Sequence, residues 1–310
     1  MTALADTAAP TRRATWIAVA ALVGATLFWA GNYIVGQRAV ETIDPVSLTL
    51  LRWAIALVPL AVVAQVVERP DWRAVARAWP WLLVLSASGV LGYNLFLYAA
   101  LEYTDAFSAS LVSAFNPALI TLAAAVFLRE RLTALSVGGV VAALAGVLVV
   151  LSDGDPASLL TSGFGTGELL MIGSIGAWTV YTIVGRRGPR LPAVTSTAVQ
   201  AGIAVAALVP FSLAAGGPAL PQSGAAMWSL LFIAVFPSVL SYLLWNRALT
   251  AIPPGRAGVF LNLITVFTAV FTILAGQPWT AAQLVGGAIV LGGVVLTNLK
   301  AFTGRGRAPD

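Results

Sequence analysis

Apolar residues fall into ten long runs separated by short polar connections. The hydrocarbon core of a bilayer is about 30 Å thick, and a helix of about 20 apolar residues crosses it. Backbone amides must be hydrogen-bonded inside hydrocarbon, so we expect each run to be a helix. The pattern predicts an all-α polytopic membrane protein with ten transmembrane helices. The runs cover 15–36, 46–67, 80–101, 106–128, 134–152, 167–185, 192–214, 225–247, 255–275 and 281–299.

Basic residues lie almost entirely on one side of this ten-helix arrangement. Fifteen of the seventeen fall in connections on that side or in the terminal tails; the exceptions are Arg38 and Arg52, which lies inside the second run. Because Lys and Arg are enriched in cytoplasmic loops, we predict that the N and C termini are cytoplasmic. The expected location is a plasma membrane, in particular a bacterial inner membrane. The first run exceeds the 7–15 residues usual in a signal peptide, which disfavours that alternative.

A sequence echo divides the chain into two halves. FWAGNYIVGQR at 28–38 returns as AWTVYTIVGRR at 177–187, so that Trp29 matches Trp178 and Arg38 matches Arg187 at an offset of 149. Five helices per half is an odd number, so the second repeat must be inverted in the membrane, an architecture of many secondary transporters. Farther along the offset is 147, with matches of Trp81 to Trp228, Thr133 to Thr280, Gly139 to Gly286 and Gly146 to Gly293.

The domain prediction follows from these two repeats. We expect a cytoplasmic tail at 1–14, a first five-helix repeat at 15–152 and an external linker at 153–165. The second, inverted repeat is expected at 166–300 and a cytoplasmic tail at 301–310.

Composition supports this class and excludes others. Hydrophobic residues make up 59% of the chain and charged residues 9%, against about 25% charged in soluble proteins. Cys and His are both absent, which excludes disulfides and thiolate or imidazole metal sites, and we expect no cofactor. The net charge of +5 is accounted for by membrane orientation, so nucleic acid is not an expected partner.

Polar and aromatic side chains at mid-helix depth are the candidate functional residues, because such groups face protein or a water-filled cavity. We expect them to form one substrate cavity with aromatic walls and amide rims, and we expect Pro117 and Pro237 to kink their helices. The candidates are Trp29, Asn32, Tyr33, Arg52, Asn94, Tyr98, Asn116, Trp178, Tyr181, Tyr242, Asn246 and Asn262.

Several candidates have a structural alternative. Asn116 and Asn262 either hydrogen-bond neighbouring helices or contact substrate. Arg52 either snorkels to the outer interface, forms a structural pair, or binds a substrate carboxylate in a bidentate manner. The repeated glycines of the fifth and tenth runs are assigned to close helix packing. Tryptophans near helix ends are assigned to the interfacial belt, namely Trp16, Trp53, Trp72, Trp79, Trp81, Trp228 and Trp279.

The sequence also resembles a known family. Trp29 with Asn32, Arg52, Asn116-Pro117 and the RERLT stretch at 129–133 are similar to EamA-type members of the drug/metabolite transporter superfamily, over nearly the whole chain. Within it the chain looks most like the YddG-type exporters of aromatic amino acids. The resemblance implies that the fifth and tenth helices lie outside the cavity. The second repeat departs from the first, since Gln277 stands where the first has Glu130.

These observations favour a secondary transporter. No acidic residue falls at a predicted midplane, so we expect transport down the solute gradient without a carboxylate proton relay. The leading hypothesis is export of small amphipathic solutes by alternating access. Aromatic or apolar amino acids are the favoured solutes. The expected partners are this solute and membrane lipid, and the protein is expected to be a monomer or a homodimer. The nearest alternative is efflux of multiple drugs or lipophilic cations, which aromatic faces also attract.

Two further classes are less well supported. A membrane enzyme lacks His, Cys and paired mid-membrane carboxylates, and SDGDP at 152–156 is typical of a solvated turn. A scaffold that only assembles other proteins would not need the inverted duplication, which suits alternating access.

Overall fold

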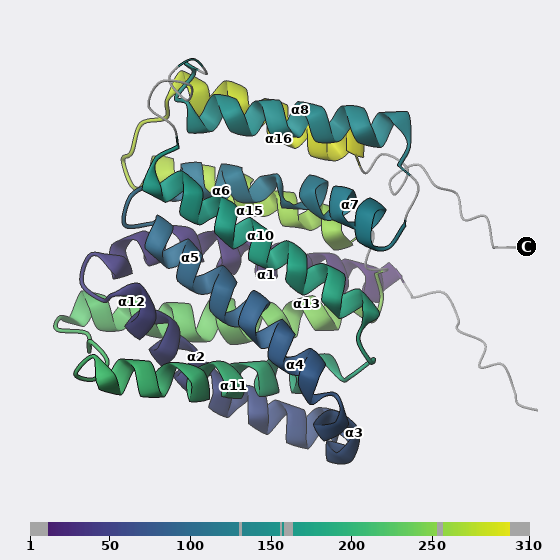
Figure 1. Ribbon diagram of the computed structural model, residues 1–310, viewed down its shortest axis with the longest axis vertical. Helices are drawn as coiled ribbons and strands as arrows, with labels where there is room; N and C mark the ends of the chain where they lie inside the picture. The colour runs from purple at the N-terminus through teal and green to yellow at the C-terminus, as the bar shows by residue number, and fades with distance from the viewer. Residues whose placement is uncertain (1–11, 130–131, 156, 158–163, 253–256, 298–310) are drawn as a thin grey trace, which may run out of the picture.

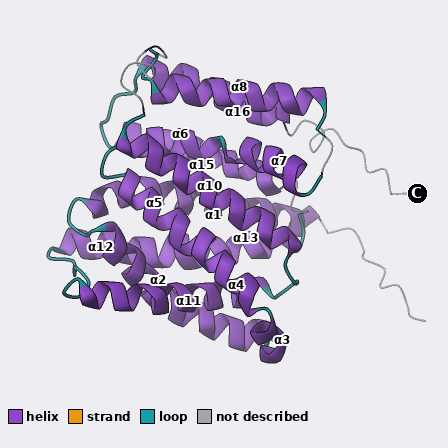
Figure 2. Cartoon of the chain, viewed as in Figure 1, coloured by secondary structure: helices purple, strands orange, loops and turns teal. Residues whose placement is uncertain are grey.

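A computed structural model describes residues 12–129, 132–155, 157, 164–252 and 257–297 (Figure 1). These residues form helices joined by short connections, and no strand occurs among them (Figure 2). Residues 1–11 of the predicted N-terminal tail, all of the predicted C-terminal tail at 301–310 and most of the predicted linker at 153–165 lie outside the described residues. The all-helical fold class is confirmed.

Helices of the first half begin with α1, which starts at Arg12, slightly before the predicted run. The third and fourth predicted runs are each interrupted, the third by a π-helical segment and the fourth at Phe115. The elements are α1 Arg12–Val40, α2 Pro45–Val63, the π-helical η1 Ala64–Glu68, α3 Trp72–Arg77, α4 Trp79–Leu85, the π-helical η2 Ser86–Gly92, α5 Tyr93–Ala100, α6 Ala106–Ala114, α7 Asn116–Phe127 and α8 Ala134–Leu151.

Helices of the second half follow the same order. The eighth predicted run also contains a π-helical segment, and the ninth opens with a short 3-10 turn. The elements are α10 Thr166–Arg187, α11 Ala193–Ala214, α12 Gly224–Val235, the π-helical η3 Phe236–Leu240, α13 Ser241–Leu249, η4 Gly258–Leu261, α15 Asn262–Leu274 and α16 Ala281–Thr297.

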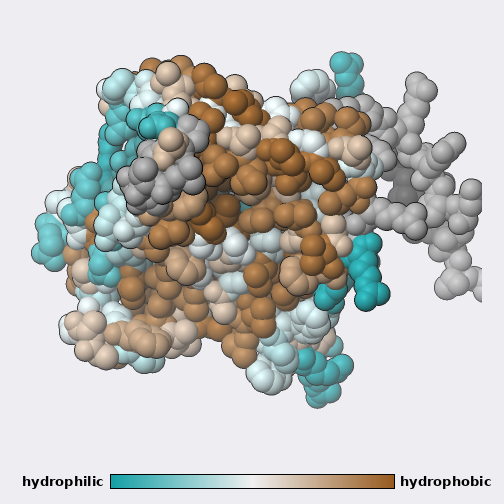
Figure 3. All heavy atoms as spheres, turned by 45° about the horizontal axis from the view of Figure 1, so that its top comes forward, coloured by the Kyte–Doolittle hydropathy of each residue, from teal (hydrophilic) through white to brown (hydrophobic). Residues whose placement is uncertain are grey.

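Among the described residues, eight helical stretches are long and apolar enough to cross a membrane, and the apolar helices α15 and α16 are shorter. Figure 3 shows apolar residues as a broad band across one face, with hydrophilic residues gathered toward its two ends. Such a band matches the environment of a bilayer, whose core offers no partner for polar groups. The count of ten spans and the orientation of the termini remain predictions.

Glycines allow α8 and α16 to pack closely and symmetrically against each other. The two helices lie together at one edge of the molecule (Figure 1). A Cβ on Gly146 would lie 2.6 Å from both the Gly286 carbonyl oxygen and the Val290 amide nitrogen. A Cβ on Gly293 would meet the Gly139 carbonyl oxygen at 2.7 Å. Exchanging each glycine for its repeat partner turns the first contact into the second, as a two-fold relation between the halves requires. The predicted packing role of these glycines is confirmed.

Proline residues produce the breaks that position the centre of the molecule. Pro237 cannot donate to the carbonyl of Ile233, four residues earlier, and the helix widens into η3 at this point. The Ser238 hydroxyl donates to that freed carbonyl at 2.7 Å. Pro117 likewise follows the junction of α6 and α7. Both predicted interruptions therefore occur, and the one at Pro237 places Ser238 in the protein interior.

The end of the first repeat's second helix is tied to the second repeat. The Glu68 carboxylate accepts hydrogen bonds from the amides of Val194 and Thr195, at 2.9 and 2.6 Å, and from the Thr195 hydroxyl at 2.6 Å. A carboxylate at a helix N-terminus satisfies free amides and is favoured by the helix dipole. This contact fixes where α11 begins, beside the connection that follows α10.

Candidate functional site

A cavity of about 1170 Å³ lies between the two halves. Eleven of the twelve candidate residues line it, and the twelfth, Tyr98, is completely buried just behind the lining. The lining candidates are Trp29, Asn32, Tyr33, Arg52, Asn94, Asn116, Trp178, Tyr181, Tyr242, Asn246 and Asn262. Helices from both repeats thus bring together side chains that the sequence scatters over more than 230 residues.

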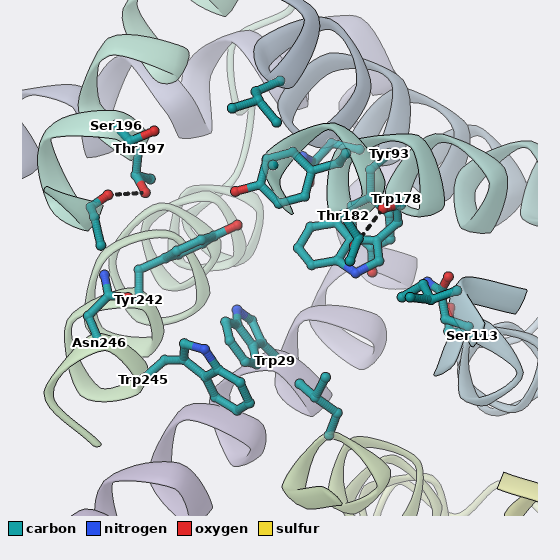
Figure 4. A pocket seen from close by; sticks show the side chains of 18 of the residues that line it. Trp29, Tyr93, Ser113, Trp178, Thr182, Ser196, Thr197, Tyr242, Trp245 and Asn246 are labelled. Carbon is teal, nitrogen blue, oxygen red and sulfur yellow. Dashed lines mark hydrogen bonds between the residues drawn. The ribbon is translucent and has the colours of Figure 1, made fainter. Parts of the chain in front are cut away.

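Aromatic rings form two facing walls of this cavity (Figure 4). On one wall Trp29 lies edge-on to Tyr242, with ring centroids 5.8 Å apart, and 5.4 Å from Trp245. On the other, Trp178 lies 5.0 Å from Tyr93 and 4.9 Å from Tyr181. Such rings present broad apolar faces for a flat ligand.

The two walls are repeat-equivalent. Tyr93 and Tyr242 are 149 residues apart, the same offset that relates Trp29 to Trp178. Each tryptophan therefore contacts the tyrosine of the opposite repeat. Tyr93 is absent from the candidate set above, and extending the 149-residue offset into the third helix is the signal that finds it.

Arg52 is a cation in the cavity lining, and it is only 4% exposed. Its Nε and Nη2 atoms both donate to the Ser238 hydroxyl, at 2.9 and 2.7 Å. Its Nη1 atom donates to Asn94 at 2.7 Å and to the Tyr98 hydroxyl. Arg52 does not snorkel to the interface, so that alternative is wrong: these buried acceptors hold the guanidinium inside.

Tyr98 positions this cation rather than lining the cavity. It accepts from Arg52 and donates to Asn32 at 2.8 Å. Its ring also lies 5.6 Å from the guanidinium carbon. None of these partners is a carboxylate, so the part of the chain that the structure describes gives Arg52 no counter-ion by hydrogen bonding.

Trp53 lies next to this cation and is only 1% exposed. The predicted interfacial role of Trp53 is therefore wrong. The guanidinium carbon of Arg52 lies 5.1 Å from its ring centre, and the residue lines the cavity. Its indole N–H is buried with no hydrogen-bond partner among the described residues. Trp81, also assigned to the belt, is 37% exposed and lines the cavity near the start of α4.

Asparagine residues divide into two groups. Asn94 uses both ends of its amide, accepting from Arg52 and donating to the Val90 carbonyl at 2.7 Å. Asn116 accepts from Thr179 of the opposite repeat at 3.3 Å, which favours its structural interpretation. By contrast, the structure gives no hydrogen bond to the cavity-lining amides of Asn246 and Asn262 within the described ranges. These two amides are free to contact a ligand.

The lining reaches only one end of the molecule. Trp81 and the connection between α10 and α11, including Arg186 and Arg190, belong to it. This connection lies at the same end as α3 (Figure 1). No described lining residue comes from the connections at the opposite end, and none is acidic. The cavity is therefore a basic, aromatic pocket whose mouth lies at the arginine-rich end.

Comparison with known proteins gives the family. The EamA-like transporter family matches residues 16–152 and again residues 165–299. The chain belongs to the EamA-like transporter family. It is therefore an integral membrane protein of a transporter family, and the resemblance seen in the sequence is confirmed.

Relatives within this family extend over almost the whole chain. The uncharacterized transporter YyaM of Bacillus subtilis is 27% identical, covering 89% of this chain and 92% of its own. A probable terminal-alkyne amino-acid exporter of Streptantibioticus cattleyicolor is 27% identical over 94% and 96%. The aromatic amino acid exporter YddG of Ancylobacter novellus is 25% identical over 91% and 98%.

A solved crystal structure shares the fold. It superposes with a TM-score of 0.62 at 23% identity, covering 95% of this chain and 99% of that chain. This likeness concerns the fold alone.

Proposed function

We propose that this EamA-family chain exports small amphipathic solutes that bear a carboxylate, with aromatic or apolar amino acids as the best candidates. The observation that carries the proposal is the buried Arg52 beside facing aromatic walls. A guanidinium matches a carboxylate in shape and charge, and the rings offer stacking surface. Two relatives bear names of amino-acid exporters, which supports this class of solute.

Alternating access is the proposed mechanism. The cavity lies between two repeats and opens at the arginine-rich end, which the charge pattern predicts to be cytoplasmic. That conformation receives solute from the cytoplasm, as an exporter must. Rocking of one repeat against the other then exposes the same site to the outside.

Transport is proposed to run down the solute gradient. A proton-coupled carrier usually holds an ionisable acid or histidine in its path. Here the described cavity lining contains no acidic residue, and the chain contains no His. Export of surplus solute then needs no second ion.

Lipophilic cations are the competing class of solute, because the same aromatic faces attract cations. Against them stand three cavity-lining arginines, Arg52, Arg186 and Arg190, and the lack of an acid among the described lining residues. A cation entering this pocket would meet charge of its own sign.

Counterflow in proteoliposomes tests the proposal. Vesicles loaded with unlabelled solute are offered labelled tryptophan, lysine or tetraphenylphosphonium. We expect transient accumulation of tryptophan alone, with or without a pH gradient. Accumulation of tetraphenylphosphonium alone would assign the chain to cation efflux, and a strict need for the pH gradient would exclude the downhill mechanism.

A further inference from the structure

We infer that the site recognises the carboxylate of its solute and not an amino group, so that aromatic monocarboxylates without an amine are substrates. This inference rests on the proposed function and narrows it. It concerns which charged group the protein binds, a choice that the family and its relatives leave open.

The charge of the lining is the first support. Arg52 and Arg190 are cationic, and none of the described lining residues is acidic. A zwitterion brings an ammonium group that needs a negative partner in such a pocket, since leaving a buried charge without a partner is costly. A carboxylate alone brings only the charge that these arginines complement.

The hydrogen bonds around Arg52 are the second support. Nε and Nη2 form the edge of the guanidinium that binds a carboxylate with two parallel bonds. In this structure both atoms donate to one neutral oxygen, that of Ser238. One hydroxyl oxygen is a weaker partner than two carboxylate oxygens. We therefore place the solute carboxylate on this edge, in exchange for Ser238.

Trp53, whose ring centre lies 5.1 Å from the Arg52 guanidinium carbon, adds a second buried donor. Its buried indole N–H lacks a partner in the described part of the chain, and buried donors are nearly always hydrogen-bonded. The adjacent guanidinium and this N–H are both donors, so the missing partner is an acceptor. A carboxylate supplies acceptor oxygens and no hydrogen to donate.

An α-ammonium finds no carboxylate to pair with among the described lining residues. Two covalent bonds join its nitrogen to the carboxylate carbon, which holds the two within about 2.5 Å. The nearby acceptors Asn94, Tyr98 and Asn32 already accept hydrogen bonds in the Arg52 network. An α-ammonium at the Arg52 edge would therefore meet the guanidinium charge, and none of the described lining residues is an acid that could offset it.

Three probe molecules that share the indole ring distinguish recognition of the carboxylate from recognition of the amine. Counterflow is measured with indole-3-propionate, which has only the carboxylate, with tryptophan, which has both groups, and with tryptamine, which has only the amine. We expect indole-3-propionate to be carried at least as fast as tryptophan, and tryptamine at least about 10-fold more slowly, as loss of a charge-assisted bond predicts.

The outcomes separate this inference from the proposed function. Transport of tryptophan without indole-3-propionate would overturn the inference and leave amino-acid export standing. Transport of tryptamine alone would overturn both, in favour of cation efflux. Transport of none of the three would also overturn both, because every probe carries the ring that the cavity is proposed to bind.

Two variants locate the carboxylate. Arg52→Gln removes the cation and is expected to abolish indole-3-propionate counterflow. Ser238→Ala keeps the cation and removes the competing hydroxyl, so binding of indole-3-propionate should tighten by about threefold or more, a modest share of a charged hydrogen bond. Ser241→Ala is the matched control, because Ser241 donates to the Ala25 carbonyl at 3.0 Å, outside the Arg52 network.

Binding of indole-3-propionate measured by isothermal titration calorimetry in detergent gives a readout that does not depend on transport. Unchanged or weaker binding in Ser238→Ala, with Ser241→Ala like the parent protein, would show that the carboxylate does not replace Ser238. If Arg52→Gln does not fold, the Ser238→Ala result alone decides the placement.

Discussion

The two repeats are alike where helices pack and in the aromatic pairs of the cavity walls, and they differ around Arg52. In the α8–α16 contact, Gly146 and Gly293 occupy equivalent positions and meet equivalent backbone atoms. Beside Arg52, Ser238 of the second repeat corresponds to Gly89 of the first, at the 149-residue offset. Ser238 holds Arg52, whereas Gly89 leaves room for the ring of Tyr181 against its backbone.

Arg52 sharpens the same contrast. With Pro45 aligned to Pro192, 147 residues later, the position of Arg52 is occupied in the second repeat by Val199. The repeats share packing residues because the two-fold arrangement needs both copies. They differ around Arg52, and the proposed solute, which has two unlike ends, does not require a symmetric site there.

The largest expected effect is at the shared glycines. Gly146→Ala places a methyl group against backbone atoms of α16 that cannot move freely, and we expect a loss of about 3 kcal/mol in the free energy of unfolding, at the upper end for overpacking. Gly138→Ala is the control in the same helix, because its Cβ would meet only the Leu296 side chain, at 4.0 Å. Equal stability of the two variants, measured by denaturant unfolding in detergent, would contradict the packing role.

The second-largest effect on stability is expected at Ser238, where the first repeat has Gly89. Ser238→Ala removes both hydrogen bonds from the Arg52 fork to this side chain, and we expect a loss of about 1.5–3 kcal/mol, typical of bonds to a charged group. Ser241→Ala loses a bond to a neutral carbonyl and should cost about 1 kcal/mol. If Ser241→Ala lowers the free energy of unfolding more than Ser238→Ala in the same assay, the Arg52–Ser238 hydrogen bonds do not stabilise the protein more than the Ser241–Ala25 bond.

A smaller difference is expected between the equivalent tryptophans. Trp29→Phe loses the indole bond to the Pro237 carbonyl, 3.1 Å long. The structure gives the Trp178 indole N–H no such partner within the described ranges. Trp29→Phe should therefore be less stable than Trp178→Phe by about 1 kcal/mol. Thermal unfolding of both variants measures the difference, and the reverse order would contradict it.

The smallest stability effect is expected at Asn246. Because its amide has no partner in the described part of the chain, Asn246→Ala should change the free energy of unfolding by less than about 0.5 kcal/mol while slowing tryptophan counterflow. Asn116→Ala loses its bond to Thr179 and should cost about 1 kcal/mol. Full counterflow in Asn246→Ala at normal expression would remove Asn246 from the site.

Much of the candidate site was predictable because polarity within an apolar run is unusual. Trp29 and Tyr242 lie inside apolar runs and Asn246 lies near the end of one, and all three line the cavity. The roles within the site were not predictable. Tyr98 also lies inside an apolar run, like Tyr242, yet it is buried behind Arg52. The position of a polar group inside an apolar run indicates that the group needs a hydrogen-bond partner. It does not indicate whether that partner is a protein group or the solute.

The sequence by itself determined the membrane class, the helical runs and the repeat, because apolar length and backbone satisfaction in lipid are local properties. Only the fold shows which polar groups hydrogen-bond to other protein groups and which remain available to a ligand. Arg52 finds its acceptor on Ser238, 186 residues away, and Trp53 at the end of the cavity finds none among the described residues. Such pairings depend on how helices from opposite repeats approach one another, and no spacing within a single helix contains that information.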